Sequence, residues 1–552
     1  MSVRASATAV AIVAAAAFAC GAWGVRRDAG EWFSPHQDAV APLRALGFLE
    51  RFTSLPPDTT DKYPTFAYLL FGSAARVALA VRGDAQADAL LSLARERGPD
   101  AWQFQVDADF WAFAEPYRDA LSDCIVAGQT LTAMFHLLLV LASAWLAAEL
   151  FPRRARLAAP LCAVLVGFHP HAVFYAHTMN VDTPALAFVV VALAATARLL
   201  KRGDVGSAIV AGVAAALAAA TKDQVTVLIA CVPVALLALI VRWRRGGAAP
   251  PVRVGALAVA ALSCVVTYAL AADFPFALDA WLRHVRFGMS PAIRAQYALA
   301  PPTFDGWITL VKFSAALFWR SAGPAGAALM IAGFVVALRS FRAVVWFLLA
   351  PAFAYWVLFV LRLGLTYPRH LLPAFLPFLV LASGAIAELS ARRGAARVVA
   401  IVLLALVPFV VWRGVTVNRL WSDDPRDRAA AWLADPATGA APGERVLVVA
   451  NAAVPPPAIP APITRRFAAA PDLARAMTEF DPHLLVRVVS PILAKIVTVE
   501  RPALPEVGAI LGSGRDATRV VAVFARAHEH PILDDIDVLP EVVVLRRLPS
   551  RP

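Results

Sequence analysis

Residues 5–23 read ASATAVAIVAAAAFACGAW and contain no charged side chain. The stretch is long enough to cross a membrane, which takes about 20 apolar residues. Alanine-rich runs of the same kind recur along the chain, which is 60% hydrophobic, 16% charged and has a mean hydropathy of +0.66. This composition excludes an ordinary soluble globule and predicts a polytopic α-helical membrane protein.

The apolar runs give about eleven candidate membrane spans. They are residues 5–24, 124–149, 157–175, 183–200, 206–221, 224–241, 252–271, 323–338, 343–361, 370–388 and 396–412. Residues 64–81 are also apolar, but a crossing there would move every later basic cluster to the other side, so we predict an interfacial or re-entrant helix. For the first segment, an uncleaved helix is favoured over a cleaved signal peptide.

Basic clusters set the orientation. They occupy alternate short loops at residues 153–156, 198–202, 242–253, 339–342 and 392–397. The positive-inside rule makes that side cytoplasmic, together with the N-terminus, and predicts an integral protein of the plasma (inner) membrane. The formal net charge of +12 resides largely in these clusters, so we expect contact with membrane lipids and no nucleic-acid partner.

The loop at residues 25–123 and the region at residues 413–552 then lie outside the cytoplasm. The second region opens on an amphipathic helix near Asp427 and Trp432 and contains strand-like runs at residues 446–449, 484–489, 519–524 and 542–545. We therefore divide the chain into a transmembrane domain, 1–412, and a small extracytoplasmic α/β domain, 413–552.

Metal and disulfide signatures are weak. The five cysteines fall in or beside apolar runs without CxxC spacing, and the histidines are scattered. We expect no disulfide framework and no metal centre. His169-Pro170-His171 is interpreted as an interfacial turn.

Polar residues suited to chemistry collect on the predicted extracytoplasmic side in three groups. The first contains His36, Asp38, Lys62 and Tyr63; the second is the hairpin tip at residues 177–184, with Asp182; the third combines Lys222 with Arg369 and His370.

The order of these motifs resembles the GT-C superfamily of membrane glycosyltransferases, in particular its protein-mannosyltransferase and aminoarabinose-transferase-like branch. The matching positions, in chain order, are Asp38, Tyr63-Pro64, Asn180-Val181-Asp182-Thr183-Pro184, Ala219-Ala220-Thr221-Lys222, Arg369-His370-Leu371-Leu372-Pro373 and Asp427-Arg428-Ala429-Ala430-Ala431-Trp432-Leu433. The first-loop acidic pair common in that group is here Gln37-Asp38, so a single carboxylate stands there.

The resemblance implies a GT-C-like fold and inverting transfer of a hexosyl or pentosyl group from a polyprenyl-phosphate donor to a lipid, glycan or protein acceptor. Asp38 is the candidate general base, with Asp182 as a second catalytic carboxylate. The candidate substrate-binding residues are His36, Lys62, Tyr63, Lys222, Arg369 and His370. No cofactor is certain, and a divalent cation is compatible with the pattern.

Other interpretations stay open. Asp182 is well placed to cap the helix that follows it, and Lys222 and Arg369 fit headgroup anchors. The chain could also be a transporter or lipid flippase, although the middles of the spans are almost free of charge, or a non-catalytic assembly partner.

Overall fold

The computed structural model describes residues 3–23, 42–50, 64–97, 115–226, 254–272, 278–289, 300–364, 368–421, 425–450 without 436, 438 and 442, 464–469, 479–489, 518–524 and 541–547, with isolated positions 25, 228, 298 and 475. The chain forms two compact units. Unit 1 comprises residues 1–23, 51–71 and 129–418, and unit 2 comprises 24–50, 72–128 and 419–552. Helices α3, α6 and α18 therefore contribute residues to both units.

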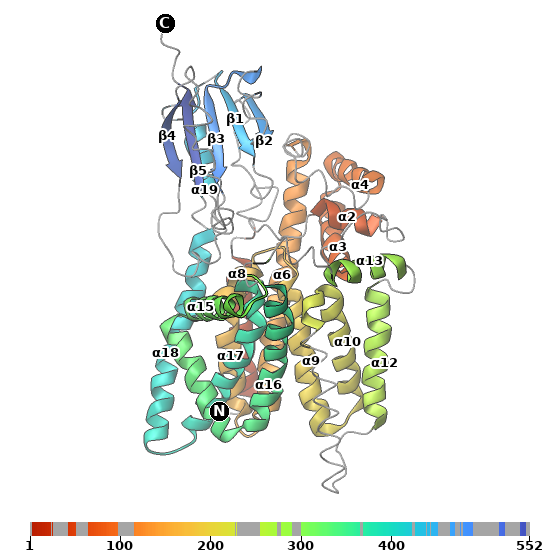
Figure 1. Cartoon of the computed structure of the whole chain (residues 1–552), viewed down its shortest axis with the longest axis vertical. Coiled ribbons are helices and arrows are strands. Elements are labelled where there is room, and N and C mark those ends of the chain that lie inside the picture. The colour runs from red at the N-terminus through yellow and green to blue at the C-terminus, as the bar shows by residue number, and fades with distance from the viewer. Residues whose placement is uncertain are drawn as a thin grey trace. The chain divides into compact units, whose positions relative to one another are not determined.

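Unit 1 is a helical bundle (Figure 1). Its described helices are α1 (Val3–Ala22), α7 (Ala155–Gly167), α8 (Pro170–Ala176), α9 (Asp182–Arg202), α10 (Val205–Thr221), α12 (Val254–Ala271), α13 (Leu278–Met289), α15 (Phe304–Ser340), α16 (Arg342–Tyr355), α17 (Pro368–Ser390) and α18 (Ala395–Trp421), with the latter part of α6 (Arg118–Leu150). Helix α10 packs between α9 and α12, and α17 packs against α7 and α15.

The prediction of a polytopic helical membrane fold is confirmed. Nine described helices are long and apolar enough to cross a membrane, or ten if α7 and α8 form one bent span. Ten of the predicted spans overlap described helices, whereas residues 224–241 lie almost entirely outside the described part. Helix α3 (Thr65–Arg82) also meets the length and apolarity criteria, so its interfacial or re-entrant placement stays a prediction.

Two spans differ from their prediction. Residues 157–175 form α7 and α8, bent by 62°. The bend follows from Pro170, because the residue before a proline is driven out of the helical region; His169 is accordingly extended, with φ −64° and ψ 126°. His169 is thus the break between the two helices, and the side chains of His169 and His171 are buried. The predicted interfacial position of this segment stays a prediction.

The span predicted at residues 323–338 is the second half of α15, whose first half extends back to Phe304 through a predicted loop. Thr303 begins this helix by accepting a hydrogen bond from the N–H of Gly306 at 3.2 Å. Gly323 interrupts the helix with φ 64° and ψ 172°, a conformation essentially confined to glycine. Pro324 follows directly, so the kink has a clear chemical cause.

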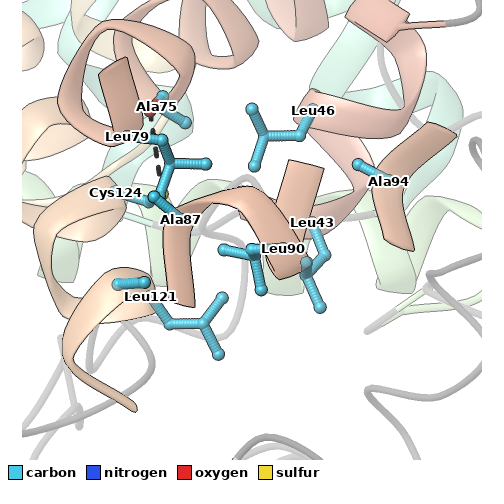
Figure 2. Close-up of a cluster of buried hydrophobic side chains, with 10 residues drawn as sticks. Leu43, Leu46, Ala75, Leu79, Ala87, Leu90, Ala94, Leu121 and Cys124 are labelled. Atoms are coloured by element: carbon cyan, nitrogen blue, oxygen red, sulfur yellow. Dashed lines mark hydrogen bonds between the residues drawn. The ribbon is translucent and has the colours of Figure 1, made fainter. Parts of the chain in front are cut away.

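In unit 2, α2 (Pro42–Glu50), the C-terminal half of α3, α4 (Ala85–Arg97) and the start of α6 enclose a small apolar cluster (Figure 2). Leu43, Leu46, Leu79 and Leu90 are at most 1% exposed. Part of the predicted loop at residues 25–123 is therefore a folded helical element.

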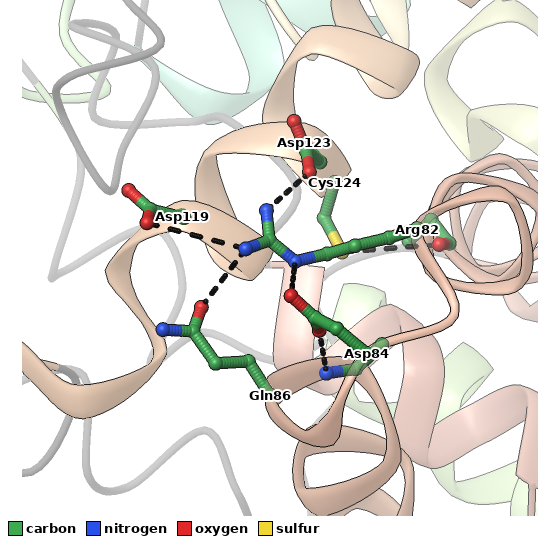
Figure 3. Close-up of polar contacts among 8 residues, drawn as sticks. Arg82, Asp84, Gln86, Asp119, Asp123 and Cys124 are labelled. Carbon is green, nitrogen blue, oxygen red and sulfur yellow. Dashed lines mark hydrogen bonds and ion pairs between the residues drawn. The ribbon is translucent and has the colours of Figure 1, made fainter.

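One arginine joins three of these helices (Figure 3). The Arg82 guanidinium donates to Asp84 and Asp123 at 2.7 Å each and lies 4.0 Å from Asp119. It also donates to Gln86 at 3.3 Å. A fork of five N–H donors suits such multiple pairing, and an ammonium group could not reproduce it.

The C-terminal part of unit 2 contains α19 (Pro425–Ala434) and a five-stranded mixed sheet of order β2-β1-β3-β5-β4. The strands are β1 (Arg445–Ala450), β2 (Thr464–Ala469), β3 (Leu484–Val489), β4 (Thr518–Phe524) and β5 (Glu541–Arg547). Leu433 of α19 packs on Val446, Val486 and Val544. The four predicted strands are confirmed; β2 was missed because Arg465 and Arg466 interrupt its apolar pattern.

The unit boundaries differ from the predicted domain boundary. Helix α18 continues to Trp421, beyond the predicted end of the last span, and the division falls after Asn418. The extracytoplasmic position of residues 413–552 stays a prediction.

Candidate functional site

A buried charged group lies where three helices of unit 1 begin or end. Asp182 is the first residue of α9, Lys222 follows the last residue of α10, and Arg369 is the second residue of α17. Lys222 Nζ donates to Asp182 Oδ1, and Arg369 Nε lies 4.0 Å from Asp182 Oδ2. The side chains are buried: Asp182 and Lys222 are each 7% exposed, and Arg369 is 13% exposed.

The hairpin tip before α9 is fixed by short-range hydrogen bonds. Asn180 Oδ1 accepts from the backbone N–H of Asp182 at 2.8 Å. Thr178 and Thr183 both donate their hydroxyls to the Tyr175 carbonyl, at 3.1 and 3.3 Å. These bonds hold the start of α9 against the end of α8.

The N-cap interpretation of Asp182 is wrong. The N-cap position is Val181, and it has no side-chain cap hydrogen bond. Asp182 instead lies inside the first turn, where the helix dipole favours a negative charge. Its two oxygens therefore face the cations and do not satisfy the free backbone N–H groups.

Lys222 reaches the site because α10 stops at Thr221. Its own N–H still donates to the Ala218 carbonyl at 3.0 Å, but its backbone is extended, with φ −154° and ψ 112°. A short 3-10 turn, η4 (Asp223–Val225), follows. A cation at a helix C-terminus also interacts favourably with the helix dipole.

Arg369 is placed by the start of α17, where Pro368 occupies the first helical position. The next residue, His370, is 2% exposed, and its ring meets Phe359 edge-on at 5.0 Å and 88°. The buried hydroxyl of Tyr355 lies within electrostatic range of Asp182 and Arg369. Tyr355 was not predicted, because it stands in an apolar span with no motif around it.

The site lies at one end of the bundle. Helix α9 has 21 residues, so it is about 32 Å long, close to the thickness of a bilayer core. At its opposite end Lys201 pairs with Glu149 at 3.6 Å. The two charged pairs therefore mark the two ends of one membrane-crossing helix.

The charges fit an anionic ligand. Counted over Asp182, Lys222 and Arg369, the sum is +1. Buried charges interact more strongly than charges in water, because the surrounding dielectric is low. An arginine fork and a lysine ammonium together are the usual protein donors to a phosphate group.

The structure thus brings together three of the predicted site residues, Asp182, Lys222 and Arg369. His370 follows Arg369 in sequence, and its ring packs against Phe359. His36, Asp38, Lys62 and Tyr63 lie outside the described residues. His177 bonds elsewhere, since its Nδ1 lies 2.7 Å from the Val173 carbonyl. Within the described ranges, no group of three or more His, Cys, Asp or Glu side chains could hold a metal ion.

No family model matches the sequence, and no curated protein matches it. The solved structures similar to the chain include two of ArnT from Cupriavidus metallidurans. The apo state is 14% identical in sequence, with 98% of each chain covered and a TM-score of 0.45. The structure bound to undecaprenyl phosphate is also 14% identical, with 97% of each chain covered and a TM-score of 0.44.

Proposed function

We propose that the chain is a lipid-carrier-dependent glycosyltransferase. It would move a sugar from a polyprenyl-phosphate donor to an acceptor hydroxyl at the extracytoplasmic face. The observation that carries this proposal is the convergence of Lys222 and Arg369 on Asp182 at one end of a membrane-spanning bundle. Such a site offers two buried cations to a phosphate at the depth of a lipid headgroup.

The reaction needs little from the protein beyond positioning and charge. The acceptor oxygen attacks the anomeric carbon from the face opposite the phosphate, and the bond from that carbon to the phosphate oxygen breaks. The electron pair stays on the polyprenyl phosphate, which is a weak base, so no acid has to protonate it. Arg369 and Lys222 would stabilise the charge that develops there.

One base must take the acceptor proton. Asp38 is the proposed base, on the strength of the family resemblance, and His36, Lys62, Tyr63 and His370 are proposed to line the donor site. Asp182 is better suited to orienting Lys222 and Arg369, because both of its oxygens already face those cations. We therefore propose that Asp182 positions the phosphate-binding cations.

The test is a transfer assay in membranes with a panel of polyprenyl-phosphate sugars. Wild type should transfer one of them, and Asp38→Asn should lose transfer by about 100-fold or more, the usual contribution of a general base. The matched control is Asp88→Asn, an exposed carboxylate of α4 in the same predicted loop. Equal turnover in Asp38→Asn and wild type would move the base elsewhere.

A transporter or flippase is the second candidate. Buried ion pairs inside a helical bundle, like Asp182 with Lys222, are also typical of ion-coupled carriers. The same membranes separate the two functions. Movement of the intact donor across the bilayer without a glycosylated product would favour the carrier, and product formation would favour the transferase.

A further inference from the structure

A second polar group lies inside unit 1, at the break between α7 and α8. His169 and His171 are each 2% exposed. The two rings stack on each other at 5.8 Å, and the His171 ring stacks on Phe375 of α17 at 5.9 Å. The His169 ring meets Phe375 at 5.1 Å in a tilted arrangement. Among the described residues, none accepts from or donates to any of the four ring nitrogens.

Arg413 of α18 brings a positive charge to the same place. Its neighbour Gly414 packs directly on the backbone of Phe168, so Arg413 stands next to the break between α7 and α8. Its Nη2 donates to the Arg320 carbonyl at 2.7 Å, while its buried Nε has no partner in the described part of the chain. No carboxylate among the described residues pairs with it.

The kink of α15 at Gly323 lies against Arg413 and adds a further polar side chain. The guanidinium of Arg413 occupies the space that a Cβ at residue 323 would fill. Two residues before that glycine, the hydroxyl of Ser321 is 1% exposed and also lacks a partner within the described ranges. Four side chains from three segments therefore each carry a polar atom without a hydrogen-bond partner among the described residues. They are His169, His171, Ser321 and Arg413.

Such an arrangement requires an occupant. Buried polar atoms in native proteins are almost always hydrogen-bonded, to protein, water or a bound ion. A charge held in a membrane protein is normally compensated by an opposite charge. Water could satisfy the imidazoles and the hydroxyl, but only an anion also compensates Arg413.

We propose that Arg413, Ser321, His169 and His171 form a binding site for a phosphate-class oxyanion. Arg413 supplies the positive charge, and Ser321 with the imidazole N–H groups supplies further donors. This inference is independent of the proposed transfer reaction.

The position along the helices points to a headgroup. Eighteen residues separate Ala395, the start of α18, from Arg413. At 1.5 Å per residue this is about 27 Å, nearly the thickness of the hydrocarbon core. Arg413 thus lies near the boundary opposite the basic cluster at residues 392–397, where lipid phosphates are found.

The experiment counts phosphate ligands bound to delipidated full-length protein in detergent by native mass spectrometry. The probes are inorganic phosphate and phosphatidic acid, with diacylglycerol as the phosphate-free control. Arg413→Gln should bind one fewer phosphatidic acid than wild type. Arg95→Gln, which removes an exposed arginine of α4 that already pairs with Glu50, should match wild type. Displacement by inorganic phosphate would show that the phosphate group alone suffices, and failure to displace would assign the site to a lipid headgroup.

The readout is a difference in count, so it does not depend on whether Lys222 and Arg369 bind a ligand of their own. Should Arg413→Gln fail to fold, Arg413→Lys retains the charge and should bind about tenfold more weakly, because the fork geometry is lost. Equal counts in Arg413→Gln and wild type, or no phosphate-dependent binding to wild type, would overturn the proposal and leave water as the partner of these atoms.

Discussion

Asp182, the first residue of α9, forms a buried ion pair with Lys222, which ends α10. Forty positions separate the two in sequence, and both stand at the same end of the bundle. With Arg369 Nε 4.0 Å from the second carboxylate oxygen, Asp182 faces two buried cations. This relationship supports both the proposed function and the first prediction.

Removing the carboxylate should cost more stability than removing one cation. Asp182→Asn leaves Lys222 and Arg369 buried beside each other, and breaking a buried pair costs about 3–5 kcal/mol. Lys222→Met should cost roughly half as much, because Arg369 still compensates Asp182. Thermal unfolding in detergent measures the order. Lys201→Met is the control, because it removes a cation from the partly exposed pair at the other end of α9. The opposite order would show that the two cations do not depend on Asp182.

Arg369→Lys should not behave as a conservative change. A lysine keeps the charge but loses the paired N–H geometry, so donor affinity should fall by about tenfold. Binding of a polyprenyl-phosphate sugar to the purified variant measures this. Unchanged affinity would remove Arg369 from the phosphate site.

Gly323→Ala should destabilise unit 1 by about 1–3 kcal/mol. The position has φ 64° and ψ 172°, and the new methyl group would meet the Arg413 guanidinium. Gly255→Ala in α12 is the control, because a Cβ there meets nothing within 4 Å and alanine favours a helix. Equal unfolding temperatures for the two variants would argue against a fixed kink.

The helical cluster of unit 2 should respond to acid through Asp84. The N–H of Ala87, which donates to this carboxylate, and the nearby Arg82 lower the pKa of Asp84. A lowered pKa means that the contribution to stability is complete above the ordinary value of about 3.9 and is lost as the pH falls below it. The unfolding temperature of the protein should therefore be the same at pH 7 and pH 5, and the stabilisation by Asp84 should be lost below about pH 4. In Asp84→Asn this part of the acid sensitivity should disappear, and an unchanged profile would contradict the assignment.

The sequence predicted the spans well and their breaks poorly. Long apolar runs such as residues 370–388 have one stable solution in lipid, because every backbone group must bond within the segment. The bend at His169-Pro170 and the kink at Gly323 depend instead on which helices pack against those points. Residues 304–322 looked like a loop, because Asp305 and Lys312 interrupt their apolar pattern.

The site was partly predictable for a similar reason. Asp182, Lys222 and Arg369 stand at span ends predicted to share one side, so sidedness alone made their meeting plausible. The sequence could not predict that Asp182 contacts both Lys222 and Arg369, because this depends on the tertiary packing of α9, α10 and α17. Arg413 and Ser321 gave no signal, because neither stands in a sequence motif and their meeting depends on how α15 and α18 pack.

The topology has its own test. The basic clusters predict that the C-terminus is extracytoplasmic. A reporter active only outside the cytoplasm, fused after Pro552, should therefore be active. Activity of a cytoplasm-only reporter at the same position would contradict the predicted sidedness.

The most direct measurement is the release of polyprenyl phosphate during sugar transfer by wild type, Arg369→Ala and Lys201→Met in the same membranes. We predict one polyprenyl phosphate released per sugar transferred, at equal rates in wild type and Lys201→Met. Arg369→Ala should be about 100-fold slower or worse, as expected on losing a group that stabilises transition-state charge. Equal release by Arg369→Ala, or no release by wild type from any donor, would contradict the account.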